Sequence, residues 1–342
     1  CSASSRPREG VAMSAIAEPE STESGFQAGR YAAIDIGTVT CRMLVADVDE
    51  AGRLHELDRE YTITNLGEGV DATGVLKPAA MQRVADAVAR FLDVLRGFAT
   101  PEHPAITTRA MATSAARDAR NADEFEALMA GLGVTLSVIP GEREAALSFA
   151  GASCDFRGER LLVVDIGGGS TEVIAGRAGS RPDRSHSFNI GCRRVTEKFF
   201  AADPPGAGEL ERARAWVEEG MRPYFDELRG AGFAPERLVA VAGTATTVVS
   251  IHERMEVYDT SRVHKAVITR PMLDGVADQL ERVPLAQRER IVGLDPGRAP
   301  VIVAGMVILQ TVLDLAGVDS FTVSESDILH GIILDEAARS AI

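Results

Sequence analysis

Apolar runs alternate with amphipathic stretches along the chain, and this alternation predicts an α/β protein. The first apolar run, residues 31–37, is followed at once by another over 42–46, so a tight turn must join two strands. A third strand is expected over 54–64, a long amphipathic helix with an early proline over 78–98, and a buried strand over 106–112. Later elements are expected as helices over 122–132, 142–150, 209–228, 299–315 and 328–338, and as strands over 134–139, 171–175 and 238–242 and from residue 160 to the glycines at 167–169.

The second half of the chain repeats the pattern that opens the first half. Aligning Asp35 with Asp165 places Asp-Ile-Gly over Asp-Ile-Gly, with an apolar strand before and after each, 130 residues apart. Arg42 then stands opposite Glu172, because both lie seven residues beyond their aspartate. The pattern predicts two pseudo-symmetric lobes that present a cation and a carboxylate from matching positions.

At 342 residues the chain is too long for one compact core, so we expect two domains of comparable size with a cleft between them. Residues 30–140 together with 326–342 are assigned to the first domain, and residues 141–325 to the second. Residues 1–29 are rich in Ser, Glu, Ala, Gly and Pro without periodicity, which predicts a flexible leader.

Composition narrows the classes of function. The net charge of -14 argues against binding to nucleic acid or to an anionic membrane, so a phosphate ligand would need a local basic pocket. The longest apolar run, residues 299–309, contains Gly305 and is well short of the roughly 20 residues that span a bilayer. The four cysteines show no CxxC spacing, which disfavours zinc and disulfides and predicts a cytoplasmic protein.

The most informative stretch is Asp165-Ile-Gly-Gly-Gly-Ser-Thr-Glu172. A strand that ends in aspartate delivers a carboxylate to the edge of the sheet, while three glycines let backbone N–H groups approach a phosphate. A glycine hairpin with a purely structural role is the alternative interpretation. The shorter Asp35-Ile-Gly-Thr38 is weak alone, but its repetition at Asp165 favours a pair of phosphate-binding loops.

A third glycine turn, Ala242-Gly-Thr-Ala-Thr-Thr247, follows a buried strand and opens a helix. Free N–H groups and the positive end of the helix dipole favour anions at such a turn, although packing alone also explains its small residues. The predicted phosphate-binding residues of the three loops are Gly37, Thr38, Gly167, Gly168, Gly169, Ser170, Gly243 and Thr244.

These three elements together resemble the superfold of sugar kinases, Hsp70 and actin. More narrowly, the chain resembles the exopolyphosphatase and guanosine pentaphosphate phosphatase (Ppx/GppA) family. The narrower resemblance rests on the motifs ATSAARDARN at 112–121, PGEREA at 140–145, DIGGGSTE at 165–172 and GRAPVIVAG at 297–305. One departure is Val39-Thr40-Cys41, where such proteins commonly have an asparagine and a serine in the first loop.

The resemblance implies a catalytic carboxylate and a magnesium site. Glu144 would position and deprotonate the attacking water, with Glu142 as the rival base and a helix N-terminus as the structural alternative for either. Asp165 and Glu172 would hold or orient Mg²⁺, directly or through water, and Asp35 is the third candidate ligand.

The resemblance also implies arginines that face the phosphate. Arg42 and Arg117 match catalytic positions of the family, and Arg298 is a further phosphate-binding candidate. Guanidinium groups suit this role because they stay charged and bind phosphate oxygens in pairs. Surface charge is the alternative interpretation of any one of them.

The implied fold is α/β, with two duplicated actin-like (ribonuclease H-like) domains and a cleft between them. The implied activity is that of an exopolyphosphatase, which releases orthophosphate from the end of inorganic polyphosphate by metal-assisted in-line attack of water. Guanosine pentaphosphate is the alternative substrate, because both molecules present the same terminal anhydride. An ATP-dependent kinase of the same superfold and a non-catalytic actin-like nucleotide-binding module are remoter alternatives. The family further implies a homodimer.

Overall fold

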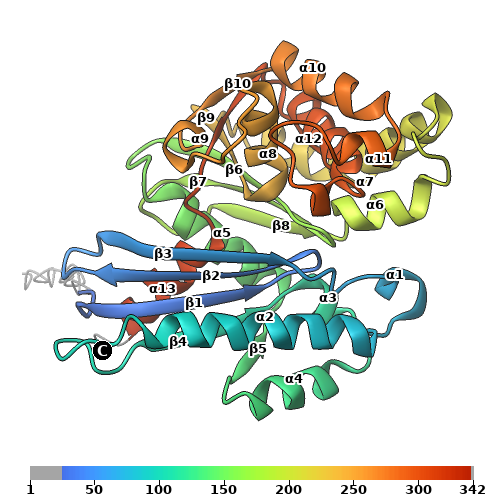
Figure 1. The fold of residues 1–342 in the computed structure, drawn as a ribbon. Coiled ribbons are helices and arrows are strands. Elements are labelled where there is room, and N and C mark those ends of the chain that lie inside the picture. The colour runs from blue at the N-terminus through green and yellow to red at the C-terminus, as the bar shows by residue number, and fades with distance from the viewer. Residues whose placement is uncertain (1–24, 340–342) are drawn as a thin grey trace, which may run out of the picture.

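The computed structural model describes residues 25–339, so the predicted leader lies almost wholly outside the described residues. Figure 1 shows two halves, each built on one sheet. The first sheet has five strands in the order β3-β2-β1-β4-β5. They are β1 (Gly29–Ile36), β2 (Thr40–Val48), β3 (Leu54–Ile63), β4 (Thr107–Ala112) and β5 (Leu136–Val138).

The second sheet repeats the topology of the first. Its order is β10-β11-β9-β6-β7-β8, in which β6, β7 and β8 form an antiparallel meander like β1, β2 and β3. Strands β9 and β11 then add in parallel, as β4 and β5 do, and β10 is an extra antiparallel edge. The strands are β6 (Arg160–Ile166), β7 (Thr171–Arg177), β8 (Arg184–Phe188), β9 (Arg237–Val241), β10 (Val267–Thr269) and β11 (Ser320–Val323). The predicted duplication is confirmed.

The register of the two leading hairpins is the same. Asp35 pairs across β1 and β2 with Arg42, and Asp165 pairs across β6 and β7 with Glu172. Each hairpin therefore sets its aspartate beside the residue seven positions later. The two strands and the turn between them fix both side chains at the same edge of the sheet.

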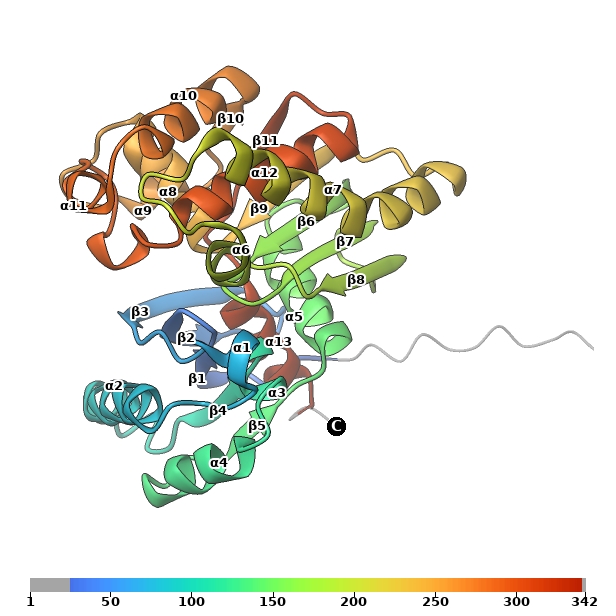
Figure 2. The same cartoon turned by 90° about the vertical axis from the view of Figure 1, so that its right-hand side faces the viewer.

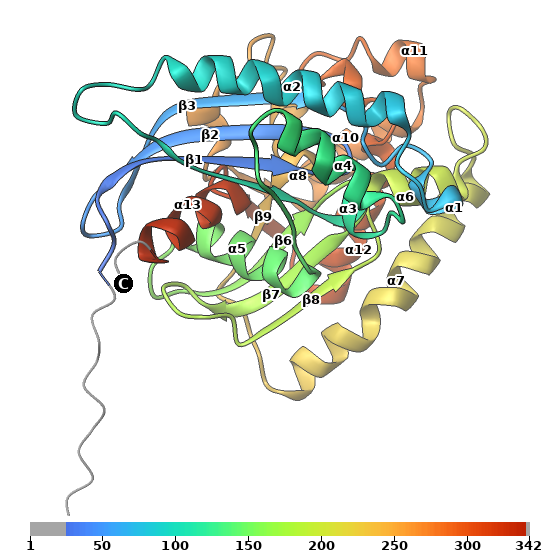
Figure 3. The ribbon, with the colours of Figure 1, turned by 90° about the horizontal axis from the view of Figure 1, so that it is seen from below.

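Helices cover the outer face of each sheet (Figure 3). The first sheet packs against α2 (Pro78–Arg96) and α4 (Ala122–Gly131), and the second packs against α7 (Ala207–Gly230), α8 (Ala242–His252) and α12 (Ile302–Ala316). The remaining outer helices are α1 (Val70–Thr73), α3 (Ser114–Arg117), α6 (Cys192–Phe199), α9 (Thr260–Val263), α10 (Arg270–Glu281), α11 (Leu285–Arg288) and the 3₁₀ turn Pro296–Arg298.

Two helices lie between the sheets (Figure 2). Helix α5 (Gly141–Ser153) follows the last strand of the first sheet but packs on the second, where Phe149 meets the inner face. Helix α13 (Ile328–Arg339) follows the second sheet but packs on the first, where Ile332 is buried. The two halves thus exchange helices, and this exchange buries the inner face of each sheet.

The expected helix over 299–315 begins later, at Ile302, after the 3₁₀ turn Pro296–Arg298. Ten elements in the described part of the chain were not expected from the sequence: α1, α3, α6, α9, α10, α11, the 3₁₀ turn Pro296–Arg298, β8, β10 and β11. The three strands are five, three and four residues long, and β8 reads Arg-Ser-His-Ser-Phe, with only Phe188 buried. Such short polar runs carry little periodic signal.

Among residues 25–339, no helix has both the length and the apolar character needed to cross a membrane.

The crossing of α5 and α13 yields the first prediction. A Cβ added at Gly331 would lie 1.9 Å from the carbonyl oxygen of Leu147, so Gly331→Ala must push the helices apart. We expect a loss of about 1–3 kcal/mol in the free energy of unfolding, measured by urea denaturation. Gly275→Ala is the matched control: Gly275 is exposed within α10 with nothing near its would-be Cβ, so alanine should be neutral or stabilising. Equal effects of the two changes would contradict the assigned contact.

Candidate active site

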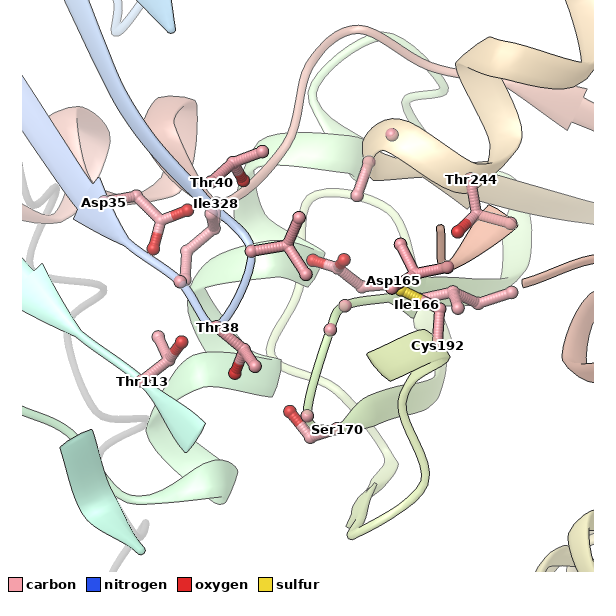
Figure 4. Close-up of a pocket in the computed structure, with 18 of the residues that line it drawn as sticks. Asp35, Thr38, Thr40, Thr113, Asp165, Ile166, Ser170, Cys192, Thr244 and Ile328 are labelled. Atoms are coloured by element: carbon pink, nitrogen blue, oxygen red, sulfur yellow. The ribbon is translucent and has the colours of Figure 1, made fainter. Parts of the chain in front are cut away.

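A cavity lies where the two leading hairpins face each other (Figure 4). It is bounded by the turn after β1, the glycine turn after β6 and the start of α8. Most of the residues predicted from the sequence line it: Asp35, Gly37, Thr38, Arg42, Glu144, Asp165, Gly167, Gly168, Gly169, Ser170, Gly243, Thr244 and Arg298. Arg117 and Glu172 are not part of the lining.

The two hairpin turns touch through glycine. A Cβ added at Gly168 would lie 2.6 Å from Val39 Cγ2, and one at Gly169 would lie 2.4 Å from the hydroxyl oxygen of Ser114. The same hydrogen bond closes both turns. The N–H of Gly37 donates to the carbonyl of Thr40 (2.9 Å), and the N–H of Gly167 donates to the carbonyl of Ser170 (3.0 Å). Only residues without a side chain allow the two turns to approach so closely.

The backbone of the second turn is oriented by α6. The N–H groups of Cys192 and Arg193 donate to the carbonyls of Gly167 and Gly168, at 3.0 and 2.9 Å. The carbonyls of Gly167 and Gly168 are therefore hydrogen-bonded to the start of α6. The N–H groups of Thr38, Gly168 and Gly169 have no acceptor among the described residues, and a phosphate in this cavity would supply one.

Four carboxylates are buried around the cavity: Asp35, Glu144, Asp165 and Glu172. Burial raises the pKa of all four, to about 6 for Asp165 and about 7 for Glu144, and well above the ordinary value for Glu172. The carboxylates also act on one another, because Asp35 and Asp165 both raise the pKa of Glu144, and Glu144 raises the pKa of Glu172. A cluster of buried acids with mutually raised pKa values is typical of a functional site that takes a cation.

Glu144 stands in the first turn of α5 and is buried, whereas Glu142 is exposed. Arg117, from the end of α3, donates Nη1 to Glu144 Oε2 over 3.0 Å and to the carbonyl of Ile139 over 3.0 Å. The guanidinium therefore holds the Glu144 carboxylate in one orientation. It also lowers the pKa of Glu144 against the larger effect of burial.

Comparison with known proteins shows the family of this chain. Residues 44–340 match the sequence profile described as the Ppx/GppA phosphatase family. The chain belongs to this family. It is 38% identical over 324 residues to exopolyphosphatase 2 of Mycobacterium tuberculosis, covering 90% of this chain and 98% of that protein. It is also 34% identical to a bifunctional 3-dehydroquinate synthase/phosphatase of Fusobacterium nucleatum, covering 89% of this chain and 46% of that protein.

Solved structures show the same fold. A protein described as exopolyphosphatase-like superposes with a TM-score of 0.83 at 34% identity, over 92% of this chain and all of that one. An exopolyphosphatase from Cytophaga hutchinsonii gives a TM-score of 0.80 at 26% identity, over 90% and 98% of the two chains. The Ppx/GppA member from Aquifex aeolicus gives 0.74 at 28% identity, over 92% and 99%. The predicted two-domain actin-like fold is therefore confirmed.

Within this Ppx/GppA cavity, the donor set suits magnesium. Asp35 Oδ2 accepts from Arg42 Nη2 (2.6 Å), and Asp165 Oδ2 accepts from the hydroxyl of Ser148 (2.7 Å). The Oδ1 atom of each aspartate makes no hydrogen bond to a described residue. No three His, Cys, Asp or Glu side chains between residues 25 and 339 converge enough to enclose a metal ion. Mg²⁺ does not need such a cage, because it keeps several waters and takes one or two carboxylates together with phosphate oxygens.

The surroundings of two predicted residues, Glu172 and Arg298, are different from each other. Glu172 lies behind the second turn, where its Oε1 accepts from the hydroxyl of Ser187 (2.7 Å), so its assignment to the metal stays a prediction. Arg298 lies against the third loop: a Cβ added at Gly243 would be 1.2 Å from Nη1. Its guanidinium has no hydrogen bond or ion pair with a described residue, which leaves it available to an anion.

A second cavity, of about 420 Å³, opens beside the first and shares Arg42, Ala242, Gly243 and Arg298 with it. Sequence reasoning missed most of its lining, including Tyr61, Tyr258 and Asp327. Tyr61, on β3, donates its hydroxyl to Asp295 Oδ2 (2.8 Å) across the cleft. The single aromatic residue of the 255–258 loop, Tyr258, carried the only local signal, and motif matching looks for glycines and charges instead.

The titration of Glu144 gives the second prediction. Since Arg117 lowers the pKa of Glu144, Arg117→Met should move that pKa above the value of about 7 in the unmodified protein. Carbon-13 NMR of labelled glutamate carboxyls measures both values. Arg120→Met is the control: Arg120 bonds only to backbone (2.9 Å to the Thr73 carbonyl) and should leave the pKa of Glu144 unchanged. A Glu144 pKa that falls or stays constant in Arg117→Met would refute the electrostatic role of the pair.

Proposed function

We propose that this chain is an exopolyphosphatase that hydrolyses the terminal phosphoanhydride bond of inorganic polyphosphate and releases orthophosphate. One observation carries the proposal: the unpaired N–H groups of Thr38, Gly168 and Gly169 and the buried Glu144 lie in the same cavity. The similarity to the M. tuberculosis protein named exopolyphosphatase 2 supports it.

The proposed reaction needs a base and a charge-stabilising cradle. Glu144, with a pKa of about 7, is partly ionised near neutrality and takes a proton from water as the water oxygen bonds to the terminal phosphorus. The bond from phosphorus to the bridging oxygen breaks, and the shortened chain leaves with the electron pair. The loop amides stabilise the charge that spreads over the transferred group.

Cations complete the proposed site. Arg298, without an anionic partner in the structure, would bind the phosphate directly, and Arg42 would join it when released from Asp35. Asp35 and Asp165 are the proposed holders of Mg²⁺, whose charge would neutralise the phosphate oxygens when it is bound.

The third prediction separates the two candidate bases. Glu144→Gln keeps the shape of the side chain but cannot accept the proton, so orthophosphate release from polyphosphate should fall at least about 100-fold. Glu142→Gln alters an exposed glutamate of the same helix turn and should stay within about twofold of the unmodified protein. Release is measured colorimetrically with chains of defined length and excess Mg²⁺.

The opposite result would remove the proposal. If Glu144→Gln released orthophosphate at the unmodified rate, a non-catalytic nucleotide-binding module with contaminating activity would be the better explanation. Transfer of labelled phosphate from ATP to a sugar or carboxylate, without water-dependent release, would instead identify a kinase.

Guanosine pentaphosphate is a second candidate substrate, and the second cavity favours it. At about 420 Å³ it is within the range of small-molecule sites, and it begins where the phosphate cavity ends. Tyr61 and Tyr258, 53% and 49% exposed, offer aromatic faces to a planar base. Glu256 adds a carboxylate that would accept hydrogen bonds from guanine, whereas the carboxylate of Glu325 is already paired with Tyr258 and Arg59.

The fourth prediction tests this substrate. Tyr258→Ala removes one aromatic face and should lower kcat/KM for guanosine pentaphosphate about tenfold, since stacking of a base on an aromatic ring contributes about 1–3 kcal/mol. The value for polyphosphate should change by less than about twofold. Tyr258→Phe, which keeps the ring, is the matched control and should retain activity on both substrates. An equal loss on both substrates would rule out the base site.

Three further expectations stay predictions. Mg²⁺ dependence is tested by chelation with EDTA followed by restoration with Mg²⁺. The homodimer is tested by light scattering of the purified chain. Location in the cytoplasm is tested by cell fractionation.

A further inference from the structure

Asp327 ends the segment that leads from β11 into α13, and its side chain reaches Arg42. Oδ2 of Asp327 pairs with Nη1 of Arg42, although the two residues are 285 positions apart in the chain. Asp327 is 3% exposed and lines the second cavity, whereas Arg42 lines both cavities. The pair therefore lies at the junction of the two cavities.

The two edges of the Arg42 guanidinium are used differently. Nε and Nη2 both donate to Asp35 Oδ2, at 3.2 and 2.6 Å, while Nη1 goes to Asp327. The Nε and Nη2 edge is one of the two edges through which a guanidinium binds a phosphate in bidentate fashion. Asp35 thus occupies a bidentate edge that a phosphate could use, whereas Asp327 holds only Nη1.

Asp327 is itself rigidly held. Its Oδ1 accepts from the N–H of Leu329 (3.0 Å), and its carbonyl accepts from the N–H of Gly331 (3.1 Å), so the residue caps α13. Its own N–H donates to Nδ1 of His330 (3.3 Å). Burial alone would raise the pKa of Asp327, but Arg42, Arg59 and His330 hold it below the ordinary value, which keeps the carboxylate charged.

We propose that Asp327 is a positioning residue: it anchors Nη1 of Arg42 while the Nε and Nη2 edge passes from Asp35 to the terminal phosphate of the substrate. Once Arg42 leaves Asp35, the Asp35 carboxylate would be free to hold a cation. An unanchored arginine would lose conformational freedom on binding phosphate, and the anchor removes most of that loss beforehand. This inference rests on the proposed function, since it assumes a phosphate ligand at the loops.

A double-mutant cycle in ligand binding tests the inference without turnover. Calorimetry measures the Kd for orthophosphate, with Mg²⁺ present, in the unmodified protein, Asp327→Ala, Arg42→Met and the double variant. We expect Asp327→Ala to weaken binding about tenfold in the unmodified background and less than about twofold in the Arg42→Met background. Unchanged or tighter binding in Asp327→Ala, or an equal loss in both backgrounds, would overturn the proposal.

Two further variants keep the test decisive. Asp327→Asn retains a good helix cap but loses the charge, so it should fold if the alanine variant does not and should weaken orthophosphate binding to a smaller extent. Asp259 caps α9 through the same kind of bond, from the N–H of Ser261 (2.9 Å), and lines neither cavity. Asp259→Asn should therefore leave orthophosphate binding unchanged.

A purely structural role for Asp327 predicts a lower Tm with an unchanged Kd in the folded protein, which would contradict the inference. Failure of the proposed function is a separate result. If the unmodified protein released no orthophosphate from polyphosphate, the exopolyphosphatase proposal would fall. If the unmodified protein released orthophosphate from polyphosphate and Asp327→Ala bound orthophosphate normally, only the positioning role of Asp327 would be refuted.

Discussion

The two halves of this protein pack against each other at glycines, where the backbone comes into close contact, and the cavity depends on these contacts. At the α5–α13 crossing, a Cβ at Gly151 would lie 1.8 Å from the carbonyl oxygen of Asp327. At the hairpin turns, Gly168 and Gly169 are held just as closely against Val39 and Ser114. Side chains at these points would separate the sheets and move the loop amides of one half away from the aspartate of the other. Glycine therefore sets the width of the cavity as well as the shape of each turn.

The same closeness explains the electrostatics. Carboxylates brought together from both halves raise one another's pKa, and burial adds to the effect. Arginine offsets part of this charge: Arg117 pairs with Glu144, and Arg42 pairs with Asp35 and Asp327. A chain of net charge -14 can therefore bind a polyanion, because a few partly buried guanidinium groups and open N–H donors converge at one point.

Sequence reasoning succeeded where the information is local. Period-two apolar runs and repeated Asp-Ile-Gly turns predict the hairpins, and the register of Asp35 with Arg42 follows from a turn of fixed length. It assigns residues 141–325 and 326–342 to different domains, but it did not identify the contacts of α5 and α13, because packing partners leave no periodic trace. Sequence reasoning also missed Asp327. This residue stands in a Ser-Glu-Ser-Asp segment typical of an ordinary loop, and its partner Arg42 lies 285 positions away in the chain.

The two ends of the phosphate cavity are unequal, and this bears on how a substrate reaches it. Beside Gly169, α6 faces α1 of the other half (Figure 2). Arg194 of α6 donates to the Gly169 carbonyl (3.0 Å) and pairs with Asp118 (2.6 Å) and Asp71 of that half. These pairs close that end, whereas the other end opens into the second cavity past Arg298. For a substrate whose terminal phosphate binds at the loops, the second cavity is the adjoining space for the rest of the molecule.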